Sequence, residues 1–220
     1  IPLAMIGGGA GSAVGVTHRD AAQIDSRFHL QAGVFSRDAG RCRDFGVGLG
    51  IATDRCYPSV EVMLQREAER PDGIAAAVIV TPNAAHFTDA RACLLAGLHV
   101  ICEKPLTINL ANAITLRDLA RRESRVLALA HGYSGYAMVH QARALVADGA
   151  IGPVVEVQVE YMSGWGSEHA EAQGKRGAIW RTDPAIGGPS TAVCDLGTHA
   201  HHLARFVTGL ETTEVAAELS

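Results

Sequence analysis

The feature that most constrains the fold is an alternation of apolar runs with helix-like segments over residues 1–131. The runs contain consecutive aliphatic residues, which is typical of strands buried on both faces of a parallel sheet. The runs lie at residues 3–8, 28–36, 74–80, 99–102 and 126–131, and helical patterns at 12–23, 38–46, 59–70, 86–97 and 109–122. Helices between the strands are expected, because each parallel crossover needs one. The sequence therefore predicts an α/β fold with a doubly wound parallel sheet, the architecture of dinucleotide-binding domains.

The pattern changes after residue 131, so we predict that residues 1–131 form a dinucleotide-binding domain and 132–220 the beginning of an α+β domain. Residues 138–152 and 191–208 look helical. Residues 154–162, VVEVQVEYM, alternate apolar and polar side chains, as a strand with one solvated face does. The chain begins almost inside a strand, and TTEVAAELS near its end starts another, so we expect a C-terminally incomplete part of a longer protein.

Composition and charge narrow the class of function. A net charge of −4 with 19% charged residues is ordinary for a soluble globular protein and unsuited to binding nucleic acid. No apolar run reaches the roughly 18–20 residues that span a membrane, and no signal-peptide pattern is visible. The five cysteines form no CxxC pair, which favours free thiols in a reducing compartment. We expect a cytoplasmic protein that acts on small molecules.

A glycine-rich turn, IGGGAGSAVG, follows the first predicted strand and opens the first predicted helix. In this context glycines let the backbone approach a pyrophosphate, whose charge the helix N-terminus stabilises. Gly7 and Gly9 fit the GxGxxG fingerprint, and Gly11 gives a second frame. The third glycine falls on Ser12 in one frame and on Val14 in the other. A turn without a ligand is the alternative, but the strand–turn–helix context favours NAD or NADP.

Further candidate cofactor contacts follow the other strands, because ligands of open α/β sheets bind beyond the carboxyl ends of the strands. After the second strand, Ser36 replaces the usual acid and Arg37 can accommodate a 2′-phosphate, so NADP and NAD both fit. Solvated turns and helix caps would use the same residue types. The candidates after the third and fourth strands are Thr81, Pro82, Asn83 and His86, then Glu103 and Lys104.

The segment HVICEKPLT places Glu103 and Lys104 directly after an apolar run. Burying a charge is costly unless it is paired, so either the strand surfaces here or it delivers Lys104 into a site. Because ligands bind at the carboxyl edge of a parallel sheet, the second interpretation makes Lys104 a candidate catalytic residue. Glu103 is either a cofactor contact or a counter-charge.

A second cluster, DLGTHAHHL, lies in the predicted helix at 191–208. Asp195 and His199 share a helical face, which His202 extends. Such a face fits general acid–base chemistry, a metal site, or a solvated helix. Upstream, a loop with Trp165 and Trp180 is followed by Arg181 and Asp183 in WRTDP, and it either faces a substrate or covers a small core.

Taken together, these stretches resemble the Gfo/Idh/MocA family of NAD(P)-dependent oxidoreductases, which includes glucose–fructose oxidoreductase and inositol dehydrogenase. The matching segments are the glycine turn at 7–15, TPNAAH at 81–86, EKPL at 103–106, WRTDP at 180–184 and GGPSTAVCDLGTH at 187–199. The resemblance implies a Rossmann domain and then a domain with a largely antiparallel sheet that often mediates oligomerisation. The shifted third glycine and the short second domain depart from the family pattern.

The resemblance also implies roles for individual residues. Lys104, Asp195 and His199 are the implied catalytic set. His199 would move the hydroxyl proton while hydride passes to the nicotinamide, Lys104 would hold the reacting oxygen, and Asp195 would position substrate or imidazole. Arg181 and Tyr136 would line the pocket for a sugar or polyol.

Three hypotheses follow. The leading one is an NAD(P)-dependent oxidoreductase acting on a sugar, inositol or related polyol, as a dimer or tetramer built through its C-terminal sheet. The second is a non-catalytic sensor or scaffold that binds the dinucleotide. The third, a metal-dependent hydrolase using Asp195, His199 and His202, leaves the glycine turn and EKP unexplained, so we expect no metal.

Overall fold

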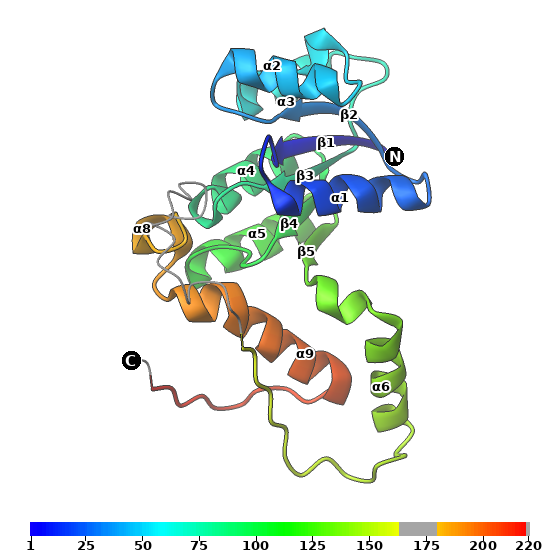
Figure 1. Ribbon diagram of the computed structural model, residues 1–220, viewed down its shortest axis with the longest axis vertical. Coiled ribbons are helices and arrows are strands. Elements are labelled where there is room, and N and C mark those ends of the chain that lie inside the picture. The colour runs from blue at the N-terminus through cyan, green and yellow to red at the C-terminus, as the bar shows by residue number, and fades with distance from the viewer. Residues whose placement is uncertain (163–179, 219–220) are drawn as a thin grey trace.

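The computed structural model describes residues 1–162 and 180–218, and its centre is a parallel sheet with helices around it (Figure 1). The strands are β1 (Pro2–Gly7), β2 (His29–Val34), β3 (Ala76–Val80), β4 (His99–Glu103) and β5 (Leu127–Ala130). The helices are α1 (Ala13–Ile24), α2 (Ala39–Gly48), α3 (Val60–Ala68), α4 (Asn83–Leu95), α5 (Leu110–Arg122), α6 (Ala137–Ala147), α8 (Pro184–Gly187) and α9 (Thr198–Thr208). Shorter turns are η1 (Thr53–Arg55), η2 (Gly132–Gly135) and the π-turn η3 (Val193–Gly197).

The strand order is β2-β1-β3-β4-β5, and every neighbouring pair is parallel. The predicted doubly wound sheet is therefore confirmed. The direction of winding reverses between β1 and β3, and a ligand crevice forms at such a switch point, beyond the carboxyl ends of the strands. On the outer side of β2, Cys56 makes an isolated parallel bridge to Gly33, which extends this edge by one residue pair.

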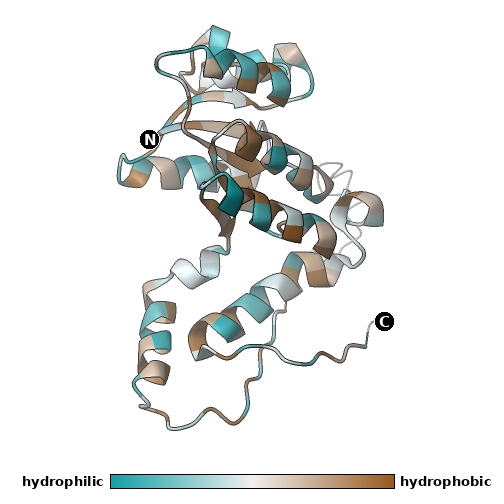
Figure 2. Cartoon of the chain, turned by 180° about the vertical axis from the view of Figure 1, so that it is seen from behind, coloured by the Kyte–Doolittle hydropathy of each residue, from teal (hydrophilic) through white to brown (hydrophobic). Residues whose placement is uncertain are grey.

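The apolar runs of the sequence form the centre of the core. β1 and β3 are buried along nearly their whole length, and Figure 2 shows the strands mainly in brown between helices that mix brown and teal. Met5, Ile79 and Val100 are fully buried, and Leu94 of α4 and Leu116 of α5 pack over the sheet. This close-packed base holds the loops at its carboxyl edge in fixed positions.

After β5, the described residues form helices and no strand. The predicted helices at 138–152 and 191–208 are confirmed as α6 and as η3 followed by α9. α6 packs against α9, where the ring of Phe206 contacts His140 at 5.2 Å and the guanidinium of Arg143 at 4.6 Å. Figure 1 shows this helix pair set apart from the sheet.

The prediction of a strand at residues 154–162 is wrong for this structure. The segment has no regular secondary structure, and Val155 is 96% exposed and Val157 and Val159 are each 42% exposed. A strand needs a neighbour for its backbone hydrogen bonds, and no described segment pairs with this one. Residues 209–218, where another strand was expected to start, likewise have no regular structure.

Two expectations from composition can be compared with the structure. All five cysteines are free thiols, as predicted, and Cys42, Cys93 and Cys102 are buried. Of the helices in the described residues, none combines the length and the apolar character needed to cross a membrane.

Candidate active site

The candidate site is assembled at the carboxyl edge of the sheet. Because neighbouring strands are parallel, the segments after β1, β2, β3 and β4 all emerge at this edge. Each cofactor residue predicted from the sequence lies in one of these segments, at the strand's last residue or shortly after it. The π-turn before α9 reaches the same edge, where Asp195 contacts Lys104.

The glycine turn between β1 and α1 is too tightly packed for side chains at three positions. Gly7 has a φ of +82°, and a Cβ there would lie 2.8 Å from the backbone of β3. A Cβ on Gly9 would collide with the carbonyl oxygen of Phe35. A Cβ on Gly15 would lie 2.5 Å from the carbonyl oxygen of Gly8. The bare backbone at a helix N-terminus forms a cradle of the kind that a pyrophosphate occupies.

Gly15 takes the close-packing place that the fingerprint gives to its third glycine, whereas the spacing of the glycines predicted Ser12 or Val14 there. Ser12 is instead the N-cap of α1, and its Oγ accepts a hydrogen bond from the Gly15 amide at 3.0 Å. Arg19 of α1 donates to the Gly8 carbonyl oxygen at 2.7 Å. The shape and the polarity of the turn therefore fit a dinucleotide.

Replacing Gly15 by alanine is expected to weaken NADH binding about tenfold, because overpacking at the Gly8 carbonyl distorts the turn. Gly48, at the end of α2, provides the matched control, since a Cβ there meets no atom within 4 Å. Fluorescence titration of NADH into both variants gives the two Kd values. An unchanged Kd in Gly15→Ala would remove the turn from the cofactor site.

The segment after β2 is suited to either nicotinamide cofactor. The Oγ of Ser36 accepts a hydrogen bond from the Asp38 amide at 3.1 Å, and Asp38 caps α2 by accepting from the Arg41 amide at 2.8 Å. The nearest carboxylate is thus used as a helix cap. Arg37 is exposed beside Ser36. A hydroxyl and a guanidinium can bind a 2′-phosphate, and the hydroxyl can also bind a ribose.

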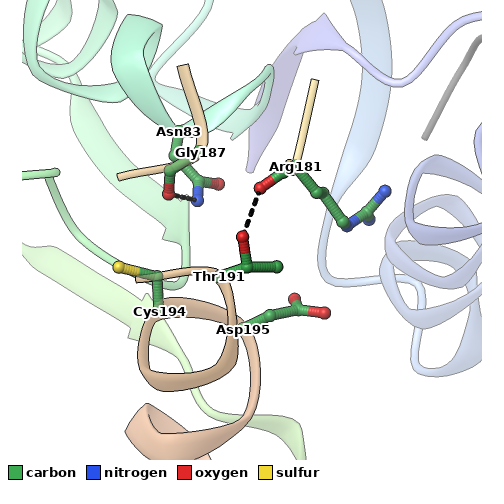
Figure 3. A pocket seen from close by; sticks show the side chains of 6 residues that line it. All are labelled: Asn83, Arg181, Gly187, Thr191, Cys194 and Asp195. Atoms are coloured by element: carbon green, nitrogen blue, oxygen red, sulfur yellow. Dashed lines mark hydrogen bonds between the residues drawn. The ribbon is translucent and has the colours of Figure 1, made fainter. Parts of the chain in front are cut away.

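The residues after β3 are tied to two other segments. Thr81 donates through Oγ1 to Asp89 at 3.0 Å, and burial raises the pKa of Asp89 to about 6. Pro82 is exposed at the start of α4. The side-chain amide of Asn83 donates to the Gly187 carbonyl oxygen at 2.7 Å (Figure 3). Asn83 thereby joins the sheet edge to α8.

His86 lies beneath the two central loops and is fully buried. Its ring nitrogens are 2.8 Å from the carbonyl oxygens of Thr81 and Pro105. Burial lowers the pKa of this imidazole, and the two carbonyls oppose the change. In this position His86 fixes the ends of β3 and β4 relative to each other.

Lys104 makes the central contact of the site. Its Nζ lies 2.6 Å from Oδ1 of Asp195 and 2.6 Å from the Asp195 carbonyl oxygen. The two side chains are only 13% and 27% exposed, so the pair is largely withdrawn from water. Asp195 belongs to the π-turn η3, a feature frequent at functional sites. The sequence put Asp195 on one face with His199, whereas its carboxylate contacts Lys104.

Glu103 points to α1, where its Oε1 lies 2.8 Å from Nε2 of His18. Its Oε2 accepts a hydrogen bond from the Lys104 amide at 3.3 Å. The sequence left Glu103 as either a cofactor contact or a counter-charge. The structure gives Glu103 a polar partner within the protein, the imidazole of His18. The contact connects the helix of the glycine turn to the loop that carries Lys104.

Aromatic rings surround His199. Its ring centroid is 4.6 Å from that of Tyr133 and 6.2 Å from that of Tyr161, and the two tyrosine hydroxyls are 2.6 Å apart. Burial, and next the charge of Lys104, lowers the pKa of His199, which favours the neutral imidazole. Tyr136, expected in the pocket, is 63% exposed, and its ring centroid lies 6.3 Å from that of Tyr133. A neutral base is thus placed beside hydroxyl groups.

A small pocket opens beside Asp195 (Figure 3). The guanidinium of Arg181 lies 4.5 Å from the ring of Trp180, and its carbonyl oxygen accepts from Thr191 at 2.8 Å. Asp183 is the N-cap of α8. Trp165 and the rest of 163–179 lie outside the described residues. The pocket is lined by Asn83, Arg181, Gly187, Thr191, Cys194 and Asp195.

Within residues 1–162 and 180–218, no three His, Cys, Asp or Glu side chains converge as a metal site would require. Asp195 pairs with Lys104, and His202 stacks on His131. The hydrolase hypothesis needs Asp195, His199 and His202 around one ion, and this geometry gives it no support.

Several residues of the site were not selected from the sequence. Tyr133 and Tyr136 both lie in HGYSGY, at the end of the strand predicted at 126–131, so this pair of aromatic residues could have been recognised from the sequence. The others depend on contacts between distant segments, which one sequence does not reveal. The residues missed are Gly15, His18, Asp89, His131, Tyr133 and Tyr161.

Comparison with protein families gives two matches. A model described as "Oxidoreductase family, NAD-binding Rossmann fold" matches residues 1–131, and one described as "GFO/IDH/MocA C-terminal domain" matches residues 139–220. An uncharacterized oxidoreductase of Bacillus subtilis, YfiI, is 40% identical over 205 residues, which are 93% of this chain and 52% of that protein.

Solved structures agree with this match. An inositol dehydrogenase homolog from Azotobacter vinelandii complexed with NAD+ is 44% identical, with a TM-score of 0.92 over 95% of this chain and 54% of its own. An inositol dehydrogenase homolog from the same organism with NADH and myo-inositol is also 44% identical, with a TM-score of 0.88 over 95% of this chain and 52% of its own. The chain therefore spans about half the length of the relatives it matches.

Proposed function

The chain belongs to the GFO/IDH/MocA family of oxidoreductases, and we propose that it transfers a hydride between NAD(P) and a hydroxyl- or carbonyl-bearing carbon of a sugar, inositol or related polyol. The observation that carries the proposal is the contact of Lys104 with Asp195 next to His199 at the cofactor edge. Residues 1–131 bind the dinucleotide in this proposal, and 132–220 begin the domain for substrate and oligomerisation.

The cofactor is held by the segments that follow β1 to β4. Gly7, Gly9 and Gly11 offer backbone to the pyrophosphate at the start of α1, where Ser12 caps the helix. Ser36 and Arg37 lie on the ribose side, and Thr81, Pro82, Asn83 and Glu103 border the nicotinamide half. When bound, NAD(P) supplies or accepts the hydride.

The protein's own part of the reaction is proton transfer and charge stabilisation. In the direction of oxidation, the substrate hydroxyl gives its proton to a ring nitrogen of the neutral His199. Lys104 donates a hydrogen bond to the same oxygen and stabilises its developing negative charge. Asp195 holds the ammonium of Lys104 in place. In the direction of reduction, the imidazolium of His199 returns the proton to the carbonyl oxygen.

The substrate class is supported by the groups that surround His199. The hydroxyls of Tyr133 and Tyr161, with Tyr136 nearby, provide donors and flat rings suited to a compound rich in hydroxyls. Arg181 lines the adjacent pocket. A solved relative contains myo-inositol. These groups favour a cyclic polyol or sugar.

The proposal places the protein in the cytoplasm as a homo-oligomer, a dimer or tetramer. The exposed Val155, Val157 and Val159 support this, because apolar side chains in contact with water leave surface that a second copy of the chain can cover. Light scattering of the full-length protein measures the oligomeric state, and a monomer would contradict this part of the proposal.

The test uses the full-length protein. Calorimetry with NAD+, NADP+, NADH and NADPH is expected to show micromolar binding of at least one pair, which is typical of enzyme substrates and corresponds to about 8 kcal/mol. A panel of inositols, aldoses and anhydrosugars, followed by absorbance at the reduced-nicotinamide band, is expected to reveal turnover. No dinucleotide binding would overturn the proposal, and binding without turnover would favour a sensor.

A further inference from the structure

Three imidazoles lie together between the end of β5 and α9. The ring of His131, which follows β5, stacks on that of His202 with centroids 4.1 Å apart and an angle of 7° between planes. His199 lies edge-on to His131, with centroids 5.6 Å apart and an angle of 80°. The reaction described above uses only His199, so His131 and His202 need another explanation.

Two nitrogen atoms of this cluster are buried without a hydrogen-bond partner among the described residues. They are Nδ1 of His131 and Nε2 of His202. Buried polar atoms without partners carry a free-energy cost and are rare in native structures. Since neither atom makes a hydrogen bond within the described residues, the interaction that these rings offer the neighbouring His199 is the packing of their faces and edges.

The environment keeps these rings uncharged. Burial, followed by repulsion from His202, His199 and Lys104, lowers the pKa of His131 to about 4. Burial, followed by Arg205, also lowers the pKa of His202. A neutral stack contributes no positive charge next to His199, and it shields one edge of that ring from water.

We propose that His131 is a positioning residue, which, clamped by His202, holds the imidazole of His199 in the orientation in which it accepts the proton of the substrate. The inference rests on the proposed function for the role of His199. The stack acts between two elements: it fixes the rotation of α9 against the end of β5, and α9 carries His199 directly after the turn with Asp195.

Other titratable groups lie near the stack. α6 presents His140 and Arg143, which contact Phe206, the next ring along α9 after His202. The groups whose charges or rings act on the three imidazoles are Glu103 at the end of β4, Lys104 after it, Asp195, Arg205 and the more distant, exposed His201 around α9, and Tyr133 and Tyr161.

The test compares His131→Ala with His131→Phe in the full-length protein. Alanine removes the ring, so kcat is expected to fall about tenfold or more through misplacement of His199. The NMR titration midpoint of His199 is expected to rise towards the ordinary value of about 6.5, because water reaches the ring. Phenylalanine keeps the ring, so both quantities are expected to stay near those of the wild type. His201→Ala, on the exposed side of α9, is the control.

A second readout is the dependence of stability on pH. Since the pKa of His131 is depressed in the folded protein, the unfolded chain binds more protons between about pH 6.5 and 4, and stability falls as the pH falls through that window. His131→Phe is expected to lose this part of the fall in melting temperature, whereas His201→Ala is expected to keep it.

The inference is overturned if His131→Ala leaves kcat and the His199 midpoint at the wild-type values. It is also overturned if His131→Phe loses as much activity as His131→Ala, since the ring alone would then not suffice. If His131→Ala does not fold, His202→Ala removes the clamp from the other side and carries the same expectations. The NMR midpoint decides the question even if no polyol is turned over, so failure of the proposed function remains distinguishable.

Discussion

Replacing Lys104 by methionine is expected to lower kcat for polyol oxidation by about 10²–10³-fold, the usual effect of removing one preorganised donor from a developing oxyanion. Methionine keeps most of the side-chain volume and removes the charge, so the loop after β4 is expected to stay in place. The Kd of NADH is expected to change little, because the cradle proposed for the pyrophosphate lies in the glycine turn and not at Lys104. Steady-state kinetics and fluorescence titration measure the two quantities.

Asp195→Asn is the matched variant, because it weakens the same contact from the other side while the ammonium remains. If Asp195 acts by holding Lys104, the double variant is expected to be no slower than Lys104→Met alone, since residues that act as a unit are not additive. A Lys104→Met protein with unchanged kcat would contradict the assignment. Equal losses of kcat and of NADH affinity would instead indicate a role in binding the cofactor.

The part of the fold that rests on local pattern could be predicted. β1 and β3 are apolar runs buried along nearly their whole length, and their period and length are enough to recognise them. The position of Lys104 follows from the same logic, because a residue after a parallel strand must emerge at the carboxyl edge. That edge is where the structure brings Asp195 to it.

The rest depends on partners that are distant in the chain. Residues 154–162 have the alternation of a strand, but alternation does not supply the neighbouring strand. His18 and Glu103 meet only because α1 passes the end of β4, and neither residue carries a local sign of the other. The third fingerprint position is similar: Gly15 is recognised by its approach to Gly8, which depends on how tightly the helix closes on the turn.

The buried ion pair of Arg55 and Glu67 lies away from the proposed chemistry and bears on stability. The two side chains are 6% and 2% exposed, and Nη2 lies 2.5 Å from Oε2. Glu67 also accepts hydrogen bonds from the Tyr57 hydroxyl at 2.6 Å and from the Ile74 amide at 3.2 Å. With a further hydrogen bond from Nε of Arg55 to Oε1 at 3.0 Å, each carboxylate oxygen of Glu67 accepts two hydrogen bonds within the protein. Such a network changes the free energy of unfolding little while it is complete, and it lowers that free energy strongly when one member is removed.

Glu67→Ala is therefore expected to lower the free energy of unfolding by about 3–5 kcal/mol, because it leaves the guanidinium of Arg55 buried without its main counter-charge. Asp72→Ala is the matched control: Asp72 pairs with the same arginine but is 61% exposed, so a loss of about 1 kcal/mol or less is expected. Urea unfolding measures both. Should Glu67→Ala not fold, Glu67→Gln keeps an acceptor for Tyr57 and is expected to fall between the two. Similar losses of unfolding free energy in Glu67→Ala and Asp72→Ala would mean that burial does not decide the strength of this network.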